Sequence, residues 1–387
     1  MDSIPSSQSA VVVQSPGNNY EMIIRDDIPV RTPGTNEILV KLSCTGLCHS
    51  EIRAVLAWGA YNPIIGHEGV GTVIQTGPNV PPSLLHQRVG VKWLYSACTT
   101  CSVCQRGFNH YCAQQKNTSR HVPGTLQQYV IADARFITRI PETVSDEVAA
   151  PLLCAGLTMA GAMGRLDDHH LSSGDWVVIS GSGGGLGHLG VQIAARMKGF
   201  RVIAVDSGEM KRKVSLESGA EVFIDYRTED VASRVREVTG GEGAHAIVVV
   251  PGTREAFAMA PQVVRNMGLI VGVGLPPNEM EWPISATVSA ARGLCIVGSS
   301  VGTEDQMTEL LEQAGRGEIT PSIQVFEFEE TPRLVDGLRN DAIAGRAVER
   351  LMHLGTHKLR GKGVVQNIEL LFVHTSYIDL ERNVTPS

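Results

Sequence analysis

The sequence has no excess of basic residues and no long apolar run. Lysine and arginine number 33 against 40 aspartate and glutamate residues, which gives a formal net charge of −7 with both signs spread along the chain. Nucleic acids and anionic membranes attract basic patches, so we expect neither as a partner. No apolar run approaches the ~20 residues that cross a bilayer. The first residues also lack the positive and apolar regions of a secretory signal, so we expect a cytoplasmic protein.

Aromatic residues are scarce as well, at 5% of the chain, whereas there are 41 glycines. With an apolar content of 43%, this composition is typical of an α/β protein. A chain of 387 residues is too long for one hydrophobic core, so it predicts two domains.

The first part of the chain has the pattern of an irregular β-rich domain. Residues 1–20 are polar, and we expect them to lack regular structure. Short β-like stretches separated by glycine and proline follow, at residues 37–42, 71–74, 88–91 and 129–131.

After about Ala150 the pattern changes to continuous apolar strands that alternate with helical segments. This alternation predicts a parallel sheet that helices cover on both faces. Residues 320–353 are expected to rejoin the first domain, because residues 323–328 alternate like a strand. The predicted strands are 176–180, 201–205, 222–224, 246–250, 269–273 and 294–297, and helices are predicted at 186–198, 209–218, 229–239 and around 303–316.

Four cysteines, Cys98, Cys101, Cys104 and Cys112, fall in the spacing C-x2-C-x2-C-x7-C. Four thiolates at this density match a closed tetrahedral zinc site. An iron–sulfur cluster is the alternative, because thiolate sites overlap. Structural disulfides fit less well, because neighbours at C-x2-C make poor bridges and nothing indicates secretion.

A glycine-rich loop follows the predicted strand 176–180 and opens a helix, and Asp206 ends the next strand nineteen residues after Gly187. This is the context of a dinucleotide-binding fingerprint, in which backbone N–H groups meet the pyrophosphate. A carboxylate at Asp206 would accept the ribose hydroxyls and repel a 2′-phosphate, so we expect NAD(H) over NADP(H). The alternatives are a plain flexible turn and an Asp206 that caps the following helix.

A second set of candidate metal ligands lies outside the cysteine cluster. Cys48, His67 and Cys154 each, taken alone, would more often be core residues. Grouped in a domain before a dinucleotide fold, two thiolates and an imidazole with an open fourth position make a catalytic zinc site.

These motifs together resemble the zinc-dependent medium-chain alcohol dehydrogenases of the yeast and fungal type. The resemblance covers roughly residues 20–353. It implies a GroES-like catalytic domain over 1–157, to which 320–354 return, and a doubly wound Rossmann NAD-binding domain over 158–319. Residues 355–387 would be an extension of unknown role. The matching segments are 48–50, 66–69, the four-cysteine segment, 91–94, 150–156, the glycine loop with Asp206, and 345–346.

The resemblance also implies roles. Cys48, His67 and Cys154 would hold a catalytic zinc, the Cys2His set that alcohol dehydrogenases use, with Glu68 able to approach the metal. The four-cysteine segment would hold a structural zinc. Ser50 would hydrogen-bond the substrate oxygen, and Trp93 would line its pocket. Cofactor contacts would come from His49, Thr158, Gly181, Gly183, Gly184, Gly185, Leu186, Gly187, Asp206, Lys211, Val273 and Arg346. The implied reaction is hydride transfer between an alcohol and NAD(H) by a zinc-bound alkoxide mechanism.

The chain departs from the family pattern near Ser50. Glu51 stands where the family has an aspartate that orients the zinc-bound histidine. Arg53 replaces a relay histidine and cannot shuttle protons, so it would bind an acidic substrate group or stay solvated at the surface. The following segment is about four residues shorter than in the yeast enzyme, with Trp58 and Tyr61 as the candidate pocket residues. We therefore expect a larger alcohol or aldehyde than ethanol, in a fungal biosynthetic pathway.

Two other interpretations stay open at this point. One is an NADP(H)-dependent, zinc-free oxidoreductase of the quinone reductase type, which would lack both cysteine sets. The other is a non-catalytic zinc-binding interaction protein, which would leave the glycine loop unexplained. We expect a homotetramer or homodimer, with strand 294–297 able to pair across a two-fold axis.

Overall fold

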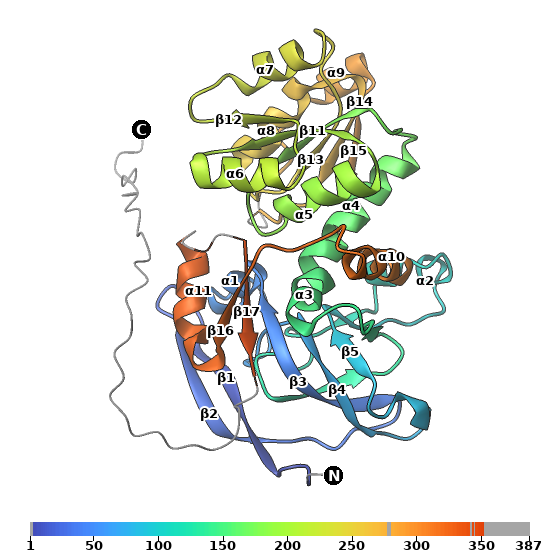
Figure 1. Cartoon of the computed structure of the whole chain (residues 1–387), viewed down its shortest axis with the longest axis vertical. Coiled ribbons are helices and arrows are strands. Elements are labelled where there is room, and N and C mark those ends of the chain that lie inside the picture. Colours follow the sequence, from blue (N-terminus) through green and yellow to red (C-terminus); the bar gives the residue numbers. More distant parts are fainter. Residues whose placement is uncertain (1–2, 277–279, 341–342, 344, 352–387) are drawn as a thin grey trace, which may run out of the picture. The chain divides into compact units, whose positions relative to one another are not determined.

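The computed structural model describes residues 3–276, 280–340, 343 and 345–351. Within them, two large sheets are joined by helices (Figure 1). The predicted extension 355–387 lies outside the described residues, and the domain boundaries proposed from the sequence stay predictions.

The six-stranded sheet is parallel throughout, with strand order β12-β11-β10-β13-β14-β15. In chain order this is 3-2-1-4-5-6, the order of dinucleotide-binding Rossmann sheets. The predicted parallel sheet is confirmed strand by strand. Its strands are β10 (Trp176–Ser180), β11 (Arg201–Asp206), β12 (Val222–Asp225), β13 (Ala244–Val249), β14 (Val264–Gly272) and β15 (Cys295–Gly298).

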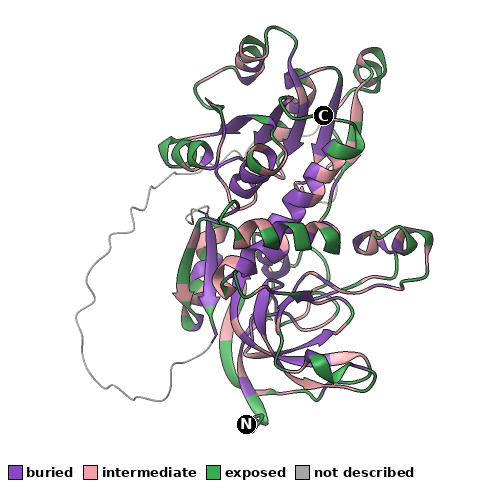
Figure 2. Cartoon of the chain, turned by 45° about the vertical axis from the view of Figure 1, so that its right-hand side comes forward, coloured by how far each residue is buried: buried purple, intermediate pink, exposed green. Residues whose placement is uncertain are grey.

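Helices cover both faces of this sheet because alternate residues of each strand point to opposite sides. Val177 packs in one apolar cluster with residues of α4 and α10, whereas its neighbour Val178 packs in a second cluster with residues of α7 and α8. Figure 2 shows the buried strands between helices whose outer faces are exposed. The helices are α4 (Leu157–Asp168), α5 (Gly187–Gln192) with the π-helical turn Ile193–Met197, α6 (Glu209–Glu217), α7 (Val231–Val238), α8 (Arg254–Val263), α9 (Ala286–Arg292) and α10 (Glu304–Gly315).

The second sheet is mixed, with order β16-β17-β3-β4-β5-β9, and β8 also pairs with β3. The late strand β17 pairs with β3, so residues from the end of the described chain lie beside residues from its beginning. The strands are β3 (Glu37–Leu47), β4 (Gly69–Thr76), β5 (Arg88–Val91), β8 (Tyr129–Asp133), β9 (Thr138–Arg139), β16 (Ile323–Glu327) and β17 (Arg346–Arg350).

Shorter elements complete the β-rich part of the chain. Strands β1 (Ser7–Ser15) and β2 (Glu21–Pro29) pair with each other, as do β6 (Leu94–Ser96) and β7 (Lys116–Asn117). The helical elements are α1 (Ser50–Val55), the 3-10 turn Pro82–Leu84, α2 (Ser102–Gln105), the 3-10 turn Asn109–Tyr111, α3 (Asp146–Pro151), the π-helical turn Leu152–Gly156, the 3-10 turn Phe328–Glu330 and α11 (Thr331–Arg339).

Two expectations about the chain are wrong. Residues 1–20 do not lack regular structure: β1 pairs with β2, and the alternate residues Val11 and Val13 are buried against the second sheet's core. An apolar stretch of membrane-spanning length also exists, because α3, the π-helical turn and α4 run on as one helix, Asp146–Asp168. By length and composition it could cross a bilayer, but 67% of its apolar window is buried inside the fold, as in a core helix.

Candidate active site and metal-ligand clusters

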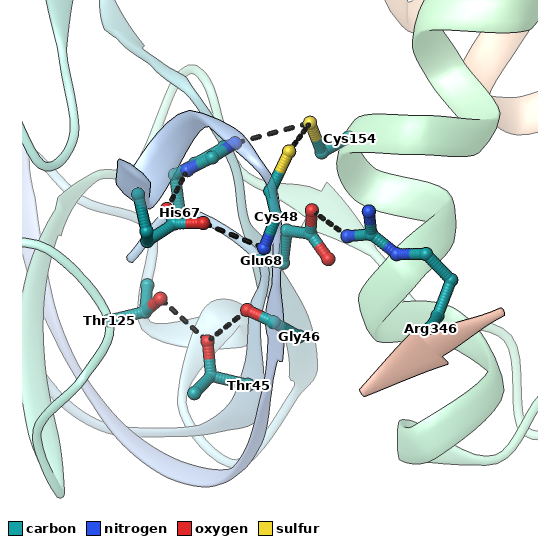
Figure 3. Close-up of polar contacts among 9 residues, drawn as sticks. Thr45, Gly46, Cys48, His67, Glu68, Thr125, Cys154 and Arg346 are labelled. Atoms are coloured by element: carbon teal, nitrogen blue, oxygen red, sulfur yellow. Dashed lines mark hydrogen bonds and ion pairs between the residues drawn. The ribbon is translucent and has the colours of Figure 1, made fainter. Parts of the chain in front are cut away.

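The structure brings Cys48, His67, Glu68 and Cys154 together, with one ligand atom from each lying within 4.8 Å of the others (Figure 3). The Sγ atoms of Cys48 and Cys154 are 3.8 Å apart, and His67 Nε2 is 3.1 Å from the Cys154 sulfur. Two thiolates bound tetrahedrally at about 2.3 Å would lie about 3.8 Å apart, so the pair of sulfurs fits a zinc ion. We call these four residues the catalytic cluster.

The backbone around each ligand of the catalytic cluster positions its side chain. Cys48 follows the end of β3, and His67 precedes β4 after Gly66, whose φ of +96° makes the turn. Cys154 lies in the π-helical turn that follows Pro151. Proline has no N–H to continue the regular helix, and π-turns are found frequently at functional sites.

Glu51 holds the imidazole of His67 in one orientation. Its Oε1 is 2.9 Å from His67 Nδ1, and its Oε2 accepts a hydrogen bond from the Cys48 backbone N–H at 2.7 Å. The ring of Trp93 also packs edge-on against His67, with centroids 5.4 Å apart. These contacts leave Nε2 directed at Cys154, which is the outer-shell arrangement that fixes a metal-binding histidine. The longer glutamate at position 51 therefore does reach the histidine.

Glu68 lies behind the ligand atoms with no solvent exposure. Its Oε1 pairs with Arg346 Nη2, while Oε2 is buried without a hydrogen-bond partner among the described residues. Gly46 makes the room, because a Cβ there would lie 2.1 Å from Oε2. Burial raises the pKa of Glu68 to about 7 against the opposing charge of Arg346. An unpartnered carboxylate oxygen beside three ligands suits exchange with a metal ion.

Ser50 and His49 begin helix α1, directly after Cys48. The Ser50 Oγ is buried and has no hydrogen-bond partner among the described residues, so it is available to an oxygen of a bound substrate. His49 is exposed. Trp58 is 45% exposed, and Tyr61 packs at the edge of the second sheet's core.

The four cysteines Cys98, Cys101, Cys104 and Cys112 also converge, and we call them the cysteine lobe. Three pairs of their sulfurs lie 3.5 to 4.0 Å apart, far beyond the ~2.05 Å of a disulfide bond, and all four cysteines are free. Backbone N–H groups of Thr100 and Cys101 lower the pKa of Cys98 to about 6, which favours a thiolate. The separations fit the edges of an S4 tetrahedron, as at the catalytic cluster.

The glycine loop and Asp206 meet at the ends of β10 and β11. Asp206 accepts hydrogen bonds from the backbone N–H groups of Gly183 and Ser207, both at 2.9 Å, and lies 3.3 Å from Lys211 Nζ. Arg346 reaches the same loop, because a Cβ at Gly185 would lie 2.8 Å from its Cδ. Arg346 therefore stands between Glu68 and the loop expected to bind the pyrophosphate.

The remaining cofactor candidates lie on the elements around this loop. Leu186 is the N-cap of α5, Thr158 is buried in the first turn of α4, and Val273 is buried directly after β14. The other loop glycines, Gly181, Gly184 and Gly187, lie between β10 and the start of α5.

Two buried ionisable groups near the site were not expected from the sequence. Lys92 is 6% exposed, and its ammonium group bridges Glu304 of α10, 2.6 Å away, and the Phe136 carbonyl and Thr138 hydroxyl, both at 2.8 Å. Glu349 of β17 is fully buried. A signal existed for Lys92, because it is a single charged residue within an apolar stretch, whereas Glu349 stands beside Arg350 and gave no such signal.

Comparison with known proteins agrees with this arrangement. A family model described as an alcohol dehydrogenase GroES-like domain matches residues 34–142, and one described as a zinc-binding dehydrogenase matches residues 185–316. Alcohol dehydrogenase 2 of Emericella nidulans is 38% identical over 368 residues, which is 89% of this chain and 98% of that protein. The chain belongs to the zinc-type medium-chain alcohol dehydrogenase family, as the resemblance predicted, and is an oxidoreductase of that class.

Solved structures of alcohol dehydrogenases share the fold. The enzyme from the archaeon Aeropyrum pernix is 25% identical, with a TM-score of 0.80 over 89% of this chain and 99% of that one. The structure of an NAD-dependent alcohol dehydrogenase is also 25% identical, with a TM-score of 0.77 over 89% of this chain and 99% of that one. The predicted fold class, a GroES-like part and a Rossmann part, is confirmed. These matches support a zinc-type alcohol dehydrogenase better than a zinc-free oxidoreductase or a non-catalytic zinc-binding protein.

Proposed function

We propose that the chain interconverts an alcohol and its aldehyde or ketone with NAD(H), and that Cys48, His67 and Cys154 hold a catalytic zinc. The observation that carries the proposal is the convergence of these three side chains and Glu68 within 4.8 Å, in a chain of this family. The cysteine lobe would hold a second, structural zinc. The proposed catalytic domain is 1–157 with 320–354, and the proposed NAD-binding domain is 158–319.

The bound groups would supply the redox chemistry: zinc polarises the C–O oxygen of the substrate and the nicotinamide exchanges the hydride. The residues of the chain bind and orient. Glu51 keeps His67 Nε2 on the cluster, and Trp93 backs the imidazole ring. The unpartnered Ser50 hydroxyl would take or return the proton of the substrate oxygen. Arginine keeps its proton at any accessible pH, so Arg53 would not continue that transfer.

We propose NAD(H) rather than NADP(H) as the cofactor. The Asp206 carboxylate is 4% exposed at the end of β11, beside the glycine loop. Its fixed negative charge would accept ribose hydroxyls and repel a 2′-phosphate. His49 and Arg346 would face the pyrophosphate, Lys211 the adenosine ribose, and Thr158, Leu186 and Val273 the nicotinamide.

We further propose a substrate larger than ethanol, because the segment between Ser50 and Gly66 is short and carries Trp58 and Tyr61 as candidate pocket residues. A cytoplasmic location suits eight free cysteines, two sets of which offer thiolates to metal. A homodimer or homotetramer is also proposed, since β15 pairs with only β14 in the described sheet and Ile296 on it is 37% exposed.

Metal analysis and steady-state kinetics on the same sample test the proposal. We expect two zinc ions per chain, activity with NAD+ well above that with NADP+, and the highest kcat/KM for an alcohol longer than ethanol. One zinc per chain without alcohol oxidation would refute the enzyme proposal. A highest kcat/KM for ethanol would refute only the substrate proposal.

A further inference from the structure

Arg53 projects from α1 toward a loop that lies far away in the sequence. Its Nη1 donates hydrogen bonds to the backbone carbonyls of Leu275 at 3.1 Å and Pro276 at 3.3 Å, 222 and 223 residues further along. The guanidinium also lies 5.7 Å from the centroid of the Trp58 ring. The side chain is half-buried and hydrogen-bonded, so it is not a solvated surface arginine.

The receiving loop, residues 273–276, is itself fixed to the six-stranded sheet. The backbone N–H groups of Val273 and Gly274 both donate to the Val249 carbonyl at 3.0 Å, at the end of β13. The loop also packs on Gly252, where a Cβ would lie 2.9 Å from the Leu275 carbonyl oxygen. These contacts therefore hold the Leu275 and Pro276 carbonyls, which Arg53 contacts, at a fixed position relative to Val273.

The other end of the contact is fixed to the catalytic cluster. Helix α1 begins two residues after Cys48, and Glu51 on the same helix bonds both the Cys48 N–H and His67 Nδ1. Glu51 is 2% exposed, so this face of the helix is anchored in the core. Arg53 leaves the same short helix and reaches the loop on the cofactor side.

We propose that Arg53 is a positioning residue that latches α1 to the loop 273–276 and so sets the separation between the catalytic cluster and Val273, which is proposed to face the nicotinamide. The proposal rests on the proposed function, in which hydride transfer requires the two sides to be held close. Hydrogen bonds from a cation to two carbonyls are strong enough for this task. The position where relatives carry a relay histidine thus has a mechanical role here.

The latch differs from a substrate-binding arginine in what it predicts. An arginine that binds a substrate carboxylate would affect only acidic substrates. The latch acts on cofactor binding and turnover whatever the charge of the alcohol, because Nη1 is already bonded to the two carbonyls.

The test uses Arg53→Met, which keeps an extended stem without donors, and Arg53→Lys, which keeps one cationic donor. Arg339→Met is the matched control: Arg339 also donates to a backbone carbonyl, Asn18 O at 3.2 Å, and also lies 5.7 Å over a ring, that of Tyr20. We expect Arg53→Met to raise the Kd for NADH and lower kcat, each by about tenfold. Arg53→Lys should recover most of both, and Arg339→Met should match the wild type.

Amide hydrogen exchange gives a readout that needs no cofactor. In Arg53→Met the amides of Val273 and Gly274 should exchange about tenfold faster, because the loop is released on one side. Gly252→Ala, which displaces the Leu275 carbonyl from the other side, should raise the Kd for NADH in the same direction and add little when combined with Arg53→Met.

Unchanged exchange in the loop together with an NADH Kd within twofold of the wild type would overturn the latch. A KM increase confined to alcohols that carry a carboxylate would overturn it too, in favour of substrate binding. If the wild-type protein neither binds NADH nor oxidises alcohols, the proposed function fails, and the exchange rates alone decide whether Arg53 holds the loop.

Discussion

The catalytic cluster and the cysteine lobe are both sets of four metal-type ligands, yet the fold builds them in opposite ways. The lobe comes from residues 98–112 alone and rests on a small apolar cluster of Leu94, Ala97 and Phe136. The catalytic cluster joins Cys48 to Cys154, 106 residues away, and three of its four members are buried. A local set can be held together by a metal, whereas a set drawn from segments distant in the sequence also depends on the packing of the fold around it.

This difference has a consequence for what each site can do. A lobe with four sulfurs has no open position and little core of its own, so metal there contributes folding free energy. At the catalytic cluster, Glu68 Oε2 and the Ser50 hydroxyl are buried without a hydrogen-bond partner among the described residues. Both groups are therefore available to bind a metal or a substrate. Removing a ligand should therefore damage stability at the lobe and chemistry at the catalytic cluster.

The largest effect is expected from Cys48→Ala. Loss of the Lewis acid should lower kcat/KM by about a thousandfold or more, because metal stabilisation of the reacting oxygen is worth several kcal/mol. Zinc content should fall from two ions to one per chain, while the melting temperature changes little. Cys44→Ala is the control, because Cys44 is buried on β3, four residues before Cys48, and belongs to neither cluster. If Cys48→Ala kept the activity of the wild type, the catalytic cluster would not be the site of the chemistry.

Cys112→Ala tests the other half. Losing the lobe's metal should cost about 4 kcal/mol of unfolding free energy or more and lower the melting temperature by roughly 10 °C. Zinc content should again fall to one ion, and limited proteolysis should cut within residues 98–112. Cys295→Ala, on β15 and outside both clusters, should behave like the wild type. Equal melting temperatures for Cys112→Ala and Cys295→Ala would show that the lobe does not stabilise the fold.

Glu51→Ala should sharpen the comparison, because only the catalytic cluster has a carboxylate that orients a histidine ligand. Without its partner, His67 loses a fixed orientation, and we expect zinc affinity and kcat/KM to fall by about 10- to 100-fold. Competition with a chelator of known affinity measures the zinc affinity, and steady-state kinetics measure kcat/KM. Substitution of the exposed Glu142 by alanine is the control. Zinc affinity that stays unchanged in Glu51→Ala would contradict the orienting role.

Glu349 should give the smallest effect. Burial raises its pKa well above the ordinary value, with Glu51 and Glu330 adding to the shift and Thr331 opposing it. The folded protein keeps a proton that the unfolded chain releases above about pH 4.3, so stability is lost as pH rises from there toward the folded pKa. Glu349→Gln should remove this slope and raise the unfolding free energy at pH 7 by about 1–3 kcal/mol.

Denaturant unfolding of Glu349→Gln over a pH series measures that gain. The exposed Glu312 on α10 offers a control, since Glu312→Gln should change the unfolding free energy by less than about 0.5 kcal/mol at any pH. If the unfolding free energy of Glu349→Gln depended on pH as it does in the wild type, another group would be responsible for that dependence.

The sequence by itself determined what depends on short spacing and on periodicity. The four cysteines of the lobe lie within fifteen residues, so their convergence could be predicted from spacing alone. The six parallel strands could be predicted because each is a continuous apolar run between helical segments. The glycine loop and Asp206 were predictable for the same reason, since consecutive strands of such a sheet end at one edge.

Only the tertiary structure decided the contacts between distant segments. The order of β17 beside β3 brings Arg346 to Glu68, and no local pattern encodes that pairing. The reach of Glu51 to His67 and of Arg53 to the loop after β14 depends on how α1 is oriented, which packing sets. The pairing of β1 with β2 is local by contrast, and the apolar run 10–13 within a polar segment was the signal for it. The distances at Arg346, Glu51 and Arg53 are set by close packing between side chains that are distant in the sequence. Local sequence patterns carry no information about such contacts, so the distances could not be predicted from them.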